Sequence, residues 1–279
     1  MNYYLVLLVF ISVLSVAVFG IKYFVSKMKE RRIRRILSEP FKEEHRRYLK
    51  KIPYYSYLSK EDREKIERFI KIFINTKEFI GVNLKVTDEM KVVIAFYACL
   101  LLLHIAEKEC YENLKTVIIY PDTVAVERIR EQEGIYSKER FLIEGEAANG
   151  TVVLVWNDVK KEAYHLRNDN VVIHEFAHEI DFMDGALEGI PPIGFSKYGE
   201  WAATVFKDYK KLRKAVLRGG NLGKYELLGD YAATDEAEFF AVLTERFFES
   251  PHALKKEFPE LYEKMKEFYK IDPSKLVKG

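Results

Sequence analysis

Residues 171–181 of this chain read Val-Val-Ile-His-Glu-Phe-Ala-His-Glu-Ile-Asp, an apolar, helix-compatible run that contains the motif His-Glu-x-x-His. Because an α-helix has 3.6 residues per turn, His174 and His178 share one face and can direct two imidazoles at one metal ion. Glu175 lies one residue further round, where its carboxylate can reach a water on that ion. The pattern is typical of zinc hydrolases, in which two histidines, a third protein ligand and a water surround the metal.

A chance match on an amphipathic helix is the alternative interpretation of this motif. The chain has only six histidines among its 279 residues, so such a match is uncommon. Bulky residues surround the motif, among them Ile173, Phe176 and Ile180, and they predict a buried helix. Buried histidine and glutamate side chains need partners, and a metal ion supplies them. The context therefore favours a zinc site.

Local spacing alone does not identify the third metal ligand. The longer metzincin pattern has a glycine at the position of Asp181 and a ligand at the position of Asp184. Asp184 can replace the usual ligand, but position 181 lacks the glycine that allows the turn, and Gly185 is more typical of a helix stop. The alternative is a glutamate on a distant helix, as in thermolysin-type sites.

The best candidate for that helix spans residues 236–248, with Thr234 or Asp235 as its N-cap. Glu238 and Glu245 are separated by two helical turns and share one stripe. Glu238 lies at the edge of an apolar face, which suits a ligand. It is equally well placed to be the glutamate of a capping box that answers Asp235.

Several further motifs make the chain similar to a known family. They are Leu84–Met90, Ala98–Leu102, Val117–Pro121, Val153–Val159, Val172–His178, Asp184–Gly185 and Gly229–Val242. In this order, and over roughly Ser59 to Pro273, they resemble the Mlc titration factor A family of zinc-dependent peptidases.

The resemblance implies the third ligand and the chemistry. It identifies Glu238 as the third zinc ligand and Tyr231 as a tyrosine that faces the metal, with Glu245 in a packing or supporting role. Glu175 is then the general base for a peptide-hydrolysing water, and Tyr231 a hydrogen-bond donor to the oxyanion. Family members also resemble anti-repressors, so binding of a transcriptional repressor, with peptidase activity secondary, is the alternative function.

The resemblance and the element pattern together predict the fold class. We expect an α+β, mostly helical, zincin-like metallopeptidase domain with a small β-sheet over residues 59–279. Asp181 and Asp184 are candidates for orienting a histidine N–H, with helix capping or a surface position as their alternative.

The N-terminus predicts a membrane anchor over residues 1–25. Residues 3–21 carry no charge, and about 20 such residues cross a hydrocarbon core of about 30 Å. A cleaved signal peptide is one alternative, but no lysine or arginine precedes the run and its end is bulky. A buried helix is the other, but an apolar run at the extreme N-terminus that precedes a basic cluster fits a membrane anchor better. The basic cluster from Lys27 to Arg35 predicts that the C-terminal side is cytoplasmic, which makes the protein single-pass.

Residues 26–58 are predicted to be a basic juxtamembrane linker, interrupted by Pro40 and Pro53. The net charge of the chain is only +2, so no nucleic-acid partner is expected. Cys99 and Cys110 show no metal-site spacing and are expected to be reduced core residues of a cytoplasmic domain.

The remaining elements follow from caps and periodicity. Ser59 is expected to cap one helix, and a second begins near Thr87. Residues 117–120 and 151–156 are predicted to be strands. Two further helices are predicted over 201–216 and within 251–273.

Overall fold

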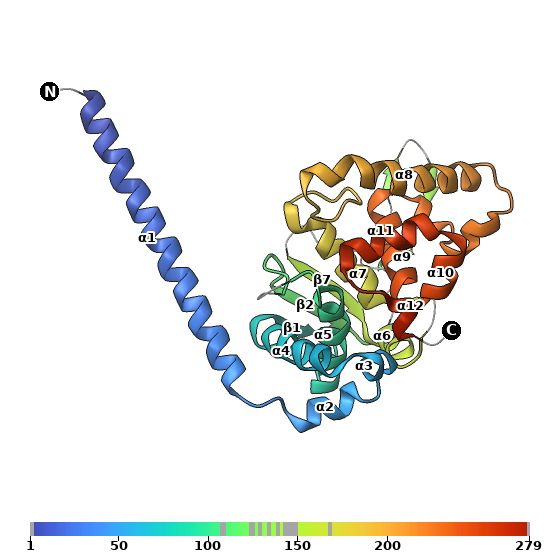
Figure 1. Ribbon diagram of the computed structural model, residues 1–279, viewed down its shortest axis with the longest axis horizontal. Coiled ribbons are helices and arrows are strands. Elements are labelled where there is room, and N and C mark those ends of the chain that lie inside the picture. The colour runs from blue at the N-terminus through green and yellow to red at the C-terminus, as the bar shows by residue number, and fades with distance from the viewer. Residues whose placement is uncertain are drawn as a thin grey trace. The chain divides into compact units, whose positions relative to one another are not determined.

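The computed structural model describes residues 3–106, 110–122, 126–127, 130–132, 135–137, 140–141, 150–166 and 169–277. The chain divides into two compact units, Met1–Phe41 and Lys42–Gly279. Figure 1 shows the elements of each unit.

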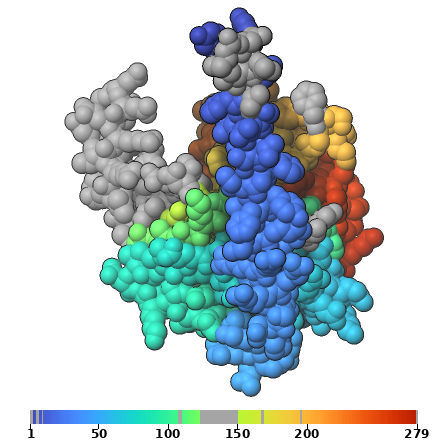
Figure 2. Space-filling model, turned by 90° about the vertical axis from the view of Figure 1, so that its left-hand side faces the viewer, coloured from blue at the N-terminus to red at the C-terminus, as the bar shows by residue number. Residues whose placement is uncertain are grey.

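The first unit is a single helix, α1, which extends from Tyr3 to Ser38. It does not end at residue 25 but continues through the basic cluster. Between Phe10 and Ser38 it is long and apolar enough to cross a membrane, with a mean hydropathy of 1.5 in its most apolar window. The described side chains of its apolar part are exposed and form a column along the helix (Figure 2). Its 36 residues correspond to a length of about 54 Å.

The second unit begins before Ser59, where the sequence placed the start of the domain. Two short helices, α2 (Glu43–Leu49) and α3 (Pro53–Tyr57), belong to it. Leu49, Ile52 and Tyr54 are completely buried, and α2 packs against α5. The segment predicted as linker is therefore part of the folded core from Lys42 onward, because its apolar side chains fill core positions.

A pair of packed helices forms the N-terminal half of this core. Helix α4 (Lys60–Thr76) begins at Ser59, whose hydroxyl accepts a hydrogen bond from the Asp62 amide. Helix α5 (Asp88–Leu102) begins at Thr87 in the same manner. Ser59 is the cap that the sequence predicted, and α5 begins where the sequence placed its start, near Thr87. Helix α5 is buried from Val92 to Leu102, which places it at the centre of the unit.

A three-stranded parallel sheet accompanies these helices. Its order is β1 (Glu78–Gly81), β2 (Thr116–Tyr120) and β7 (Thr151–Val155). Val117 pairs with Phe79 on one side and with Val152 on the other. Strands β2 and β7 alternate between buried and partly exposed residues, as expected for strands with one face on the core. The sequence predicted β2 and β7 but not β1.

Two short antiparallel pairs lie between β2 and β7 in the chain. They are β3–β6 and β4–β5, formed by Val126–Glu127, Arg130–Gln132, Ile135–Ser137 and Arg140–Phe141. Strand β7 leads directly into helix α6 (Trp156–Ala163).

The C-terminal half is helical. It contains α7 (Val171–Asp181), α8 (Phe195–Leu217), α9 (Glu236–Glu249), α10 (Pro251–Glu257), α11 (Pro259–Tyr269) and α12 (Pro273–Leu276). Short 3-10 helices span Phe182–Asp184, Gly223–Leu227 and Tyr231–Ala233. The single helix expected within 251–273 is divided at Pro259, which lacks the amide hydrogen that a continuous helix requires.

Helix α7 has its most extensive contact with α9, and aromatic rings fix its other side. The ring centroid of Phe176 lies 5.6 Å from that of Phe73 on α4 and 4.9 Å from that of Tyr111. Tyr111 in turn donates a hydrogen bond of 2.8 Å from its hydroxyl to the carbonyl of Ala98 on α5. The motif helix is thereby held between α9 and the α4–α5 pair.

Candidate metal site

Helix α7 presents His174 and His178 on one face, as the four-residue spacing predicted. Their ring centroids lie 4.9 Å apart, and their Nε2 atoms are separated by 3.3 Å. Both side chains are nearly buried, with exposed fractions of 13% and 10%. Two imidazole nitrogens therefore face the same small volume.

Helix α9 brings a carboxylate to this volume. Asp235 is its N-cap and accepts a hydrogen bond of 2.8 Å from the Glu238 amide. The Glu238 side chain does not complete a reciprocal capping box but extends toward α7. Its Oε2 lies 3.0 Å from His174 Nε2, and its Oε1 lies 3.4 Å from His178 Nε2.

These three side chains fit a metal ion. One ligand atom from each of His174, His178 and Glu238 lies within 4.8 Å of the other two. Although Glu238 Oε2 is close to His174, it is buried and has no properly aligned hydrogen-bond partner among the described residues. Buried lone pairs that converge in this way are unfavourable unless a cation lies between them. Two imidazoles and one carboxylate form the donor set of a catalytic zinc site with an open position.

The pKa shifts of Glu238 and His174 support the same interpretation. Burial raises the pKa of the Glu238 carboxyl, but the imidazoles of His174 and His178 lower it more strongly, to about 2. Burial lowers the pKa of His174, but Glu238 and Glu245 raise it well above the usual value. The cluster therefore favours a bound positive charge. A divalent cation can supply this charge as well as a proton can.

Glu245 supports His174 from the other side of its ring. Its Oε1 lies 2.7 Å from His174 Nδ1, so the ring donates its Nδ1 proton to this carboxylate and leaves the Nε2 lone pair for a metal. The second oxygen, Oε2, accepts a hydrogen bond of 2.9 Å from the Asn170 amide. The supporting role that the family resemblance left to Glu245 agrees with these contacts.

Asn170 is a site residue that the sequence reasoning missed. It caps α7 by accepting a hydrogen bond of 3.2 Å from the Ile173 amide, and its side-chain amide donates to Glu249 at 3.0 Å. Glu162 accepts a further hydrogen bond of 2.7 Å from the Val171 amide. The free amides at the start of α7 are thus bound by side chains, which fixes the helix that carries both histidines. An asparagine directly before the motif helix was the available signal.

Glu175 and Tyr231 lie at the rim of the cluster. Glu175 follows His174 on α7 and is partly exposed. Tyr231 begins the 3-10 helix before α9. Its ring centroid lies 6.0 Å from that of His174, and 44% of the residue is exposed. The Tyr231 ring is therefore near the His174 imidazole, and both side chains are accessible from solvent.

Asp181 and Asp184 bind backbone amides. Asp181 is completely buried, and its two oxygens accept hydrogen bonds of 2.8 and 2.9 Å from the amides of Gly189 and Ile190. It thereby anchors the segment that follows α7. Asp184 is exposed and accepts a hydrogen bond from the Ala186 amide at 3.2 Å. The hydrogen bonds described for both aspartates thus come from backbone amides and not from a histidine ring, which the histidine-orienting role would require. The third member of the described cluster is Glu238 and not Asp184.

A cavity of about 240 Å³ lies elsewhere, between the start of α8 and the end of α11. Trp201, Lys264 and Phe268 are among its lining residues, and no member of the histidine–glutamate cluster lines it. The chemistry of the cluster, rather than the size of this cavity, identifies the candidate site.

Comparison with known proteins gives a consistent result. Residues 26–270 match a family described as glucose-regulated metallo-peptidase M90. An uncharacterized protein of Synechocystis is 34% identical over 229 residues, which cover 80% of this chain and 82% of the relative. The Mlc titration factor A proteins of Serratia proteamaculans and Cronobacter sakazakii are each 30% identical, over 80% of this chain and 85% and 84% of their own lengths.

Proposed function

The chain belongs to the M90 family of glucose-regulated metallopeptidases, and on this basis we propose that it is a membrane-anchored, zinc-dependent enzyme that hydrolyses peptide bonds. The observation that carries the proposal is the convergence of His174, His178 and Glu238 from two helices. A chain that only bound a partner would not need this set of buried ligands together with an adjacent glutamate.

In the proposed mechanism, His174, His178 and Glu238 would hold the metal and leave one position open. Bound zinc would lower the pKa of a water toward about 7 and polarise the substrate carbonyl. Glu175 accepts the proton of the attacking water and delivers it to the leaving nitrogen. Its partly exposed position next to His174 suits a group that exchanges protons with substrate.

Tyr231 donates a hydrogen bond from its hydroxyl to the oxyanion that forms on the carbonyl. Its proximity to His174 and its exposure support this role, because the group must reach a substrate that enters from solvent. Donors of this kind contribute about 3 kcal/mol to transition-state stabilisation.

The peptide substrate would lie along β7. This strand is at one edge of the described three-stranded sheet and packs against α7. An extended peptide can add to such an edge through main-chain hydrogen bonds, which would bring a scissile bond toward the motif helix.

Helix α1 would anchor the enzyme in a membrane. Its apolar segment is followed by Lys27, Arg31 and Arg34 on the same helix, and this order predicts a cytoplasmic C-terminal side. The catalytic unit would then act in the cytoplasm, where the buried Cys99 and Cys110 stay reduced.

Replacement of the proposed base gives the decisive test. Glu175→Gln is expected to retain about one zinc per chain and the wild-type melting temperature but to lose peptide hydrolysis, because an amide cannot accept the proton. Metal analysis, thermal unfolding and cleavage of a peptide library measure these three properties. Normal turnover by this variant would refute the assigned mechanism, and wild-type protein without zinc or another divalent metal would refute the site.

A second candidate function comes from the names of the relatives. Proteins called Mlc titration factor A suggest a regulatory interaction with a repressor, and an anchored relative would sequester such a repressor at the membrane. The Glu175→Gln variant separates the two functions, because sequestration would survive the loss of hydrolysis. A pull-down with the candidate repressor, compared between wild type and variant, gives the answer.

A further inference from the structure

The outer face of α8 is strongly basic in its C-terminal half. Every exposed residue from position 207 to position 218 is a lysine or arginine except Leu217. The basic residues of this face, here called the α8 basic face, are Lys207, Lys210, Lys211, Arg213, Lys214 and Arg218.

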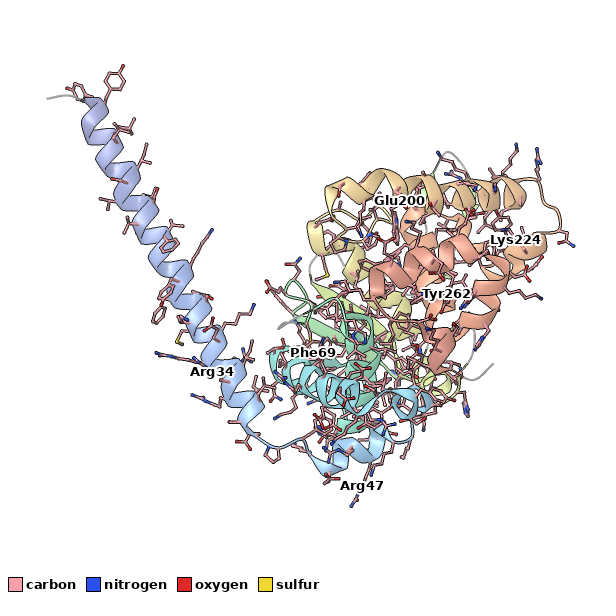
Figure 3. The ribbon with its side chains drawn as sticks, in the orientation of Figure 1. Arg34, Arg47, Phe69, Glu200, Lys224 and Tyr262 are labelled. Carbon is pink, nitrogen blue, oxygen red and sulfur yellow. The ribbon has the colours of Figure 1, made fainter. Side chains whose placement is uncertain are left out.

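Packing of the opposite side holds this face in solvent. Trp201, Val205, Tyr209 and Leu212 are buried, and the Tyr209 ring lies 5.7 Å from that of Phe239 on α9. Because the helix is fixed by its apolar side, it cannot turn its cations inward. Figure 3 shows nitrogen-tipped side chains extending outward from α8.

Few of these cations have an acidic neighbour. Lys207 lies 3.4 Å from Glu260, and Lys211 lies 4.0 Å from Asp208, but Asp208 is buried and accepts a hydrogen bond from the Tyr225 hydroxyl at 2.6 Å.

Within the part of the chain that the structure describes, no carboxylate forms an ion pair with Lys210, Arg213, Lys214 or Arg218. Lys210, Lys214 and Arg218 follow one another at four-residue spacing, so their charges repel one another along the helix. The helix dipole favours cations only in the last turn. An anionic partner would relieve this repulsion.

Leu217 adds an apolar component to the same face. It is 79% exposed, more than any other large apolar residue described in the unit Lys42–Gly279. Lysine and arginine beside an exposed apolar side chain also occur in segments that lie at a lipid–water interface.

We propose that the α8 basic face docks on the anionic head groups of a lipid membrane, with Leu217 entering the interface. The inference rests on the proposed anchoring, because α1 would keep the catalytic unit close to a bilayer and allow a weak contact to be populated. A nucleic acid offers phosphates to the same cations, but it leaves Leu217 in water. The lipid surface accounts for both features.

The test uses full-length protein in vesicles of phosphatidylcholine, either alone or mixed with anionic phosphatidylglycerol. Leu217→Cys is labelled with an environment-sensitive fluorophore, while the buried native cysteines Cys99 and Cys110 are protected from the label. We expect blue-shifted emission with the anionic vesicles only, and loss of the shift at high salt, which screens the attraction.

Two charge variants with equal net change sharpen the test. The first variant of the labelled protein combines Lys210→Glu, Lys214→Glu and Arg218→Glu. It is expected to abolish the blue shift of the emission. The matched variant replaces Lys60, Lys160 and Lys256, exposed lysines on other helices, with glutamate and is expected to keep it. If the first variant fails to fold by thermal unfolding, replacement of the same three residues with glutamine removes the charges without adding new ones and should also abolish the shift.

A second label, at Val16→Cys in α1, separates this proposal from the anchoring on which it depends. In one outcome, the label at position 16 is buried in the bilayer while the label at position 217 emits identically in neutral and anionic vesicles. That result overturns docking of the α8 basic face and leaves the anchor intact. A label at Val16 that stays in water overturns both. Binding of duplex DNA that depends on Lys210, Lys214 and Arg218, without a vesicle-dependent shift, would assign the face to nucleic acid instead.

Discussion

His174 is contacted by carboxylates at both ring nitrogens. Glu238 lies at Nε2 and Glu245 at Nδ1. The sequence placed both glutamates on one stripe of one helix, and spacing alone could not assign them. The assignment depends on where α9 crosses α7, which no local pattern specifies. Resemblance to a family supplied the choice that the residue spacing left open.

The contact with Glu245 predicts a measurable effect on metal affinity. Glu245→Gln keeps a hydrogen-bond acceptor near His174 Nδ1 but removes the charge that makes the ring a better ligand. We expect zinc affinity to fall by about 10- to 100-fold, as measured by competition with a chromophoric chelator. Glu263→Gln, on the exposed side of α11, is the matched control and should bind zinc normally. Equal affinities in both variants would contradict the supporting role.

Tyr231 gives a second prediction at this scale. Tyr231→Phe removes only the hydroxyl, so zinc content and stability should not change. If the hydroxyl binds the oxyanion, kcat should fall by about 10- to 1000-fold, with a smaller change in KM. Steady-state kinetics on a peptide substrate measure both constants. Unchanged kcat would return Tyr231 to a packing role.

At the scale of elements, the starts of helices α4, α5 and α9 were the most predictable features. Ser59, Thr87 and Asp235 cap α4, α5 and α9, because short polar side chains before an apolar run compete for the free amides of a first helical turn. Strand β1 was missed because its four residues have no fully buried position and resemble a loop. Helix α6 was missed because it starts directly from β7 without a side-chain cap.

The cap of α9 predicts a coupling between helix stability and the candidate metal site. Asp235→Ala removes the acceptor of the Glu238 amide, and we expect a loss of about 1 kcal/mol in the free energy of unfolding together with weaker zinc binding. Ser59→Ala removes the equivalent cap of α4, which carries no proposed ligand, and should cost similar stability without affecting zinc. Denaturant unfolding and chelator competition on both variants check this. Equal zinc affinities would show that the cap does not position Glu238.

At the scale of the whole molecule, the class of the fold was predictable and the start of its core was not. The family resemblance and the pattern of expected elements together predicted a mostly helical domain with a small sheet. The basic composition of residues 26–58 suggested a linker, because the many charged residues dominate the average hydropathy of this stretch. Leu49, Ile52 and Tyr54 are scattered among those charges, and their burial depends on helices that lie later in the chain.

Truncation at two positions tests this boundary. A chain beginning at Lys42 is expected to be soluble, to bind zinc and to keep the melting temperature of the second unit, because it contains the whole of that compact unit. A chain beginning at Ser59 loses Leu49, Ile52, Tyr54 and Leu58, all buried.

Each buried apolar side chain contributes about 1.5–3 kcal/mol, and domains of this kind are stable by only about 5–15 kcal/mol. The shorter chain should therefore aggregate or unfold at much lower temperature, as measured by thermal unfolding and gel filtration. If both chains melt at the same temperature, residues 42–58 are a linker after all. If the chain beginning at Lys42 still sediments with membranes at high salt, which screens the contact of the α8 basic face, anchoring does not depend on α1.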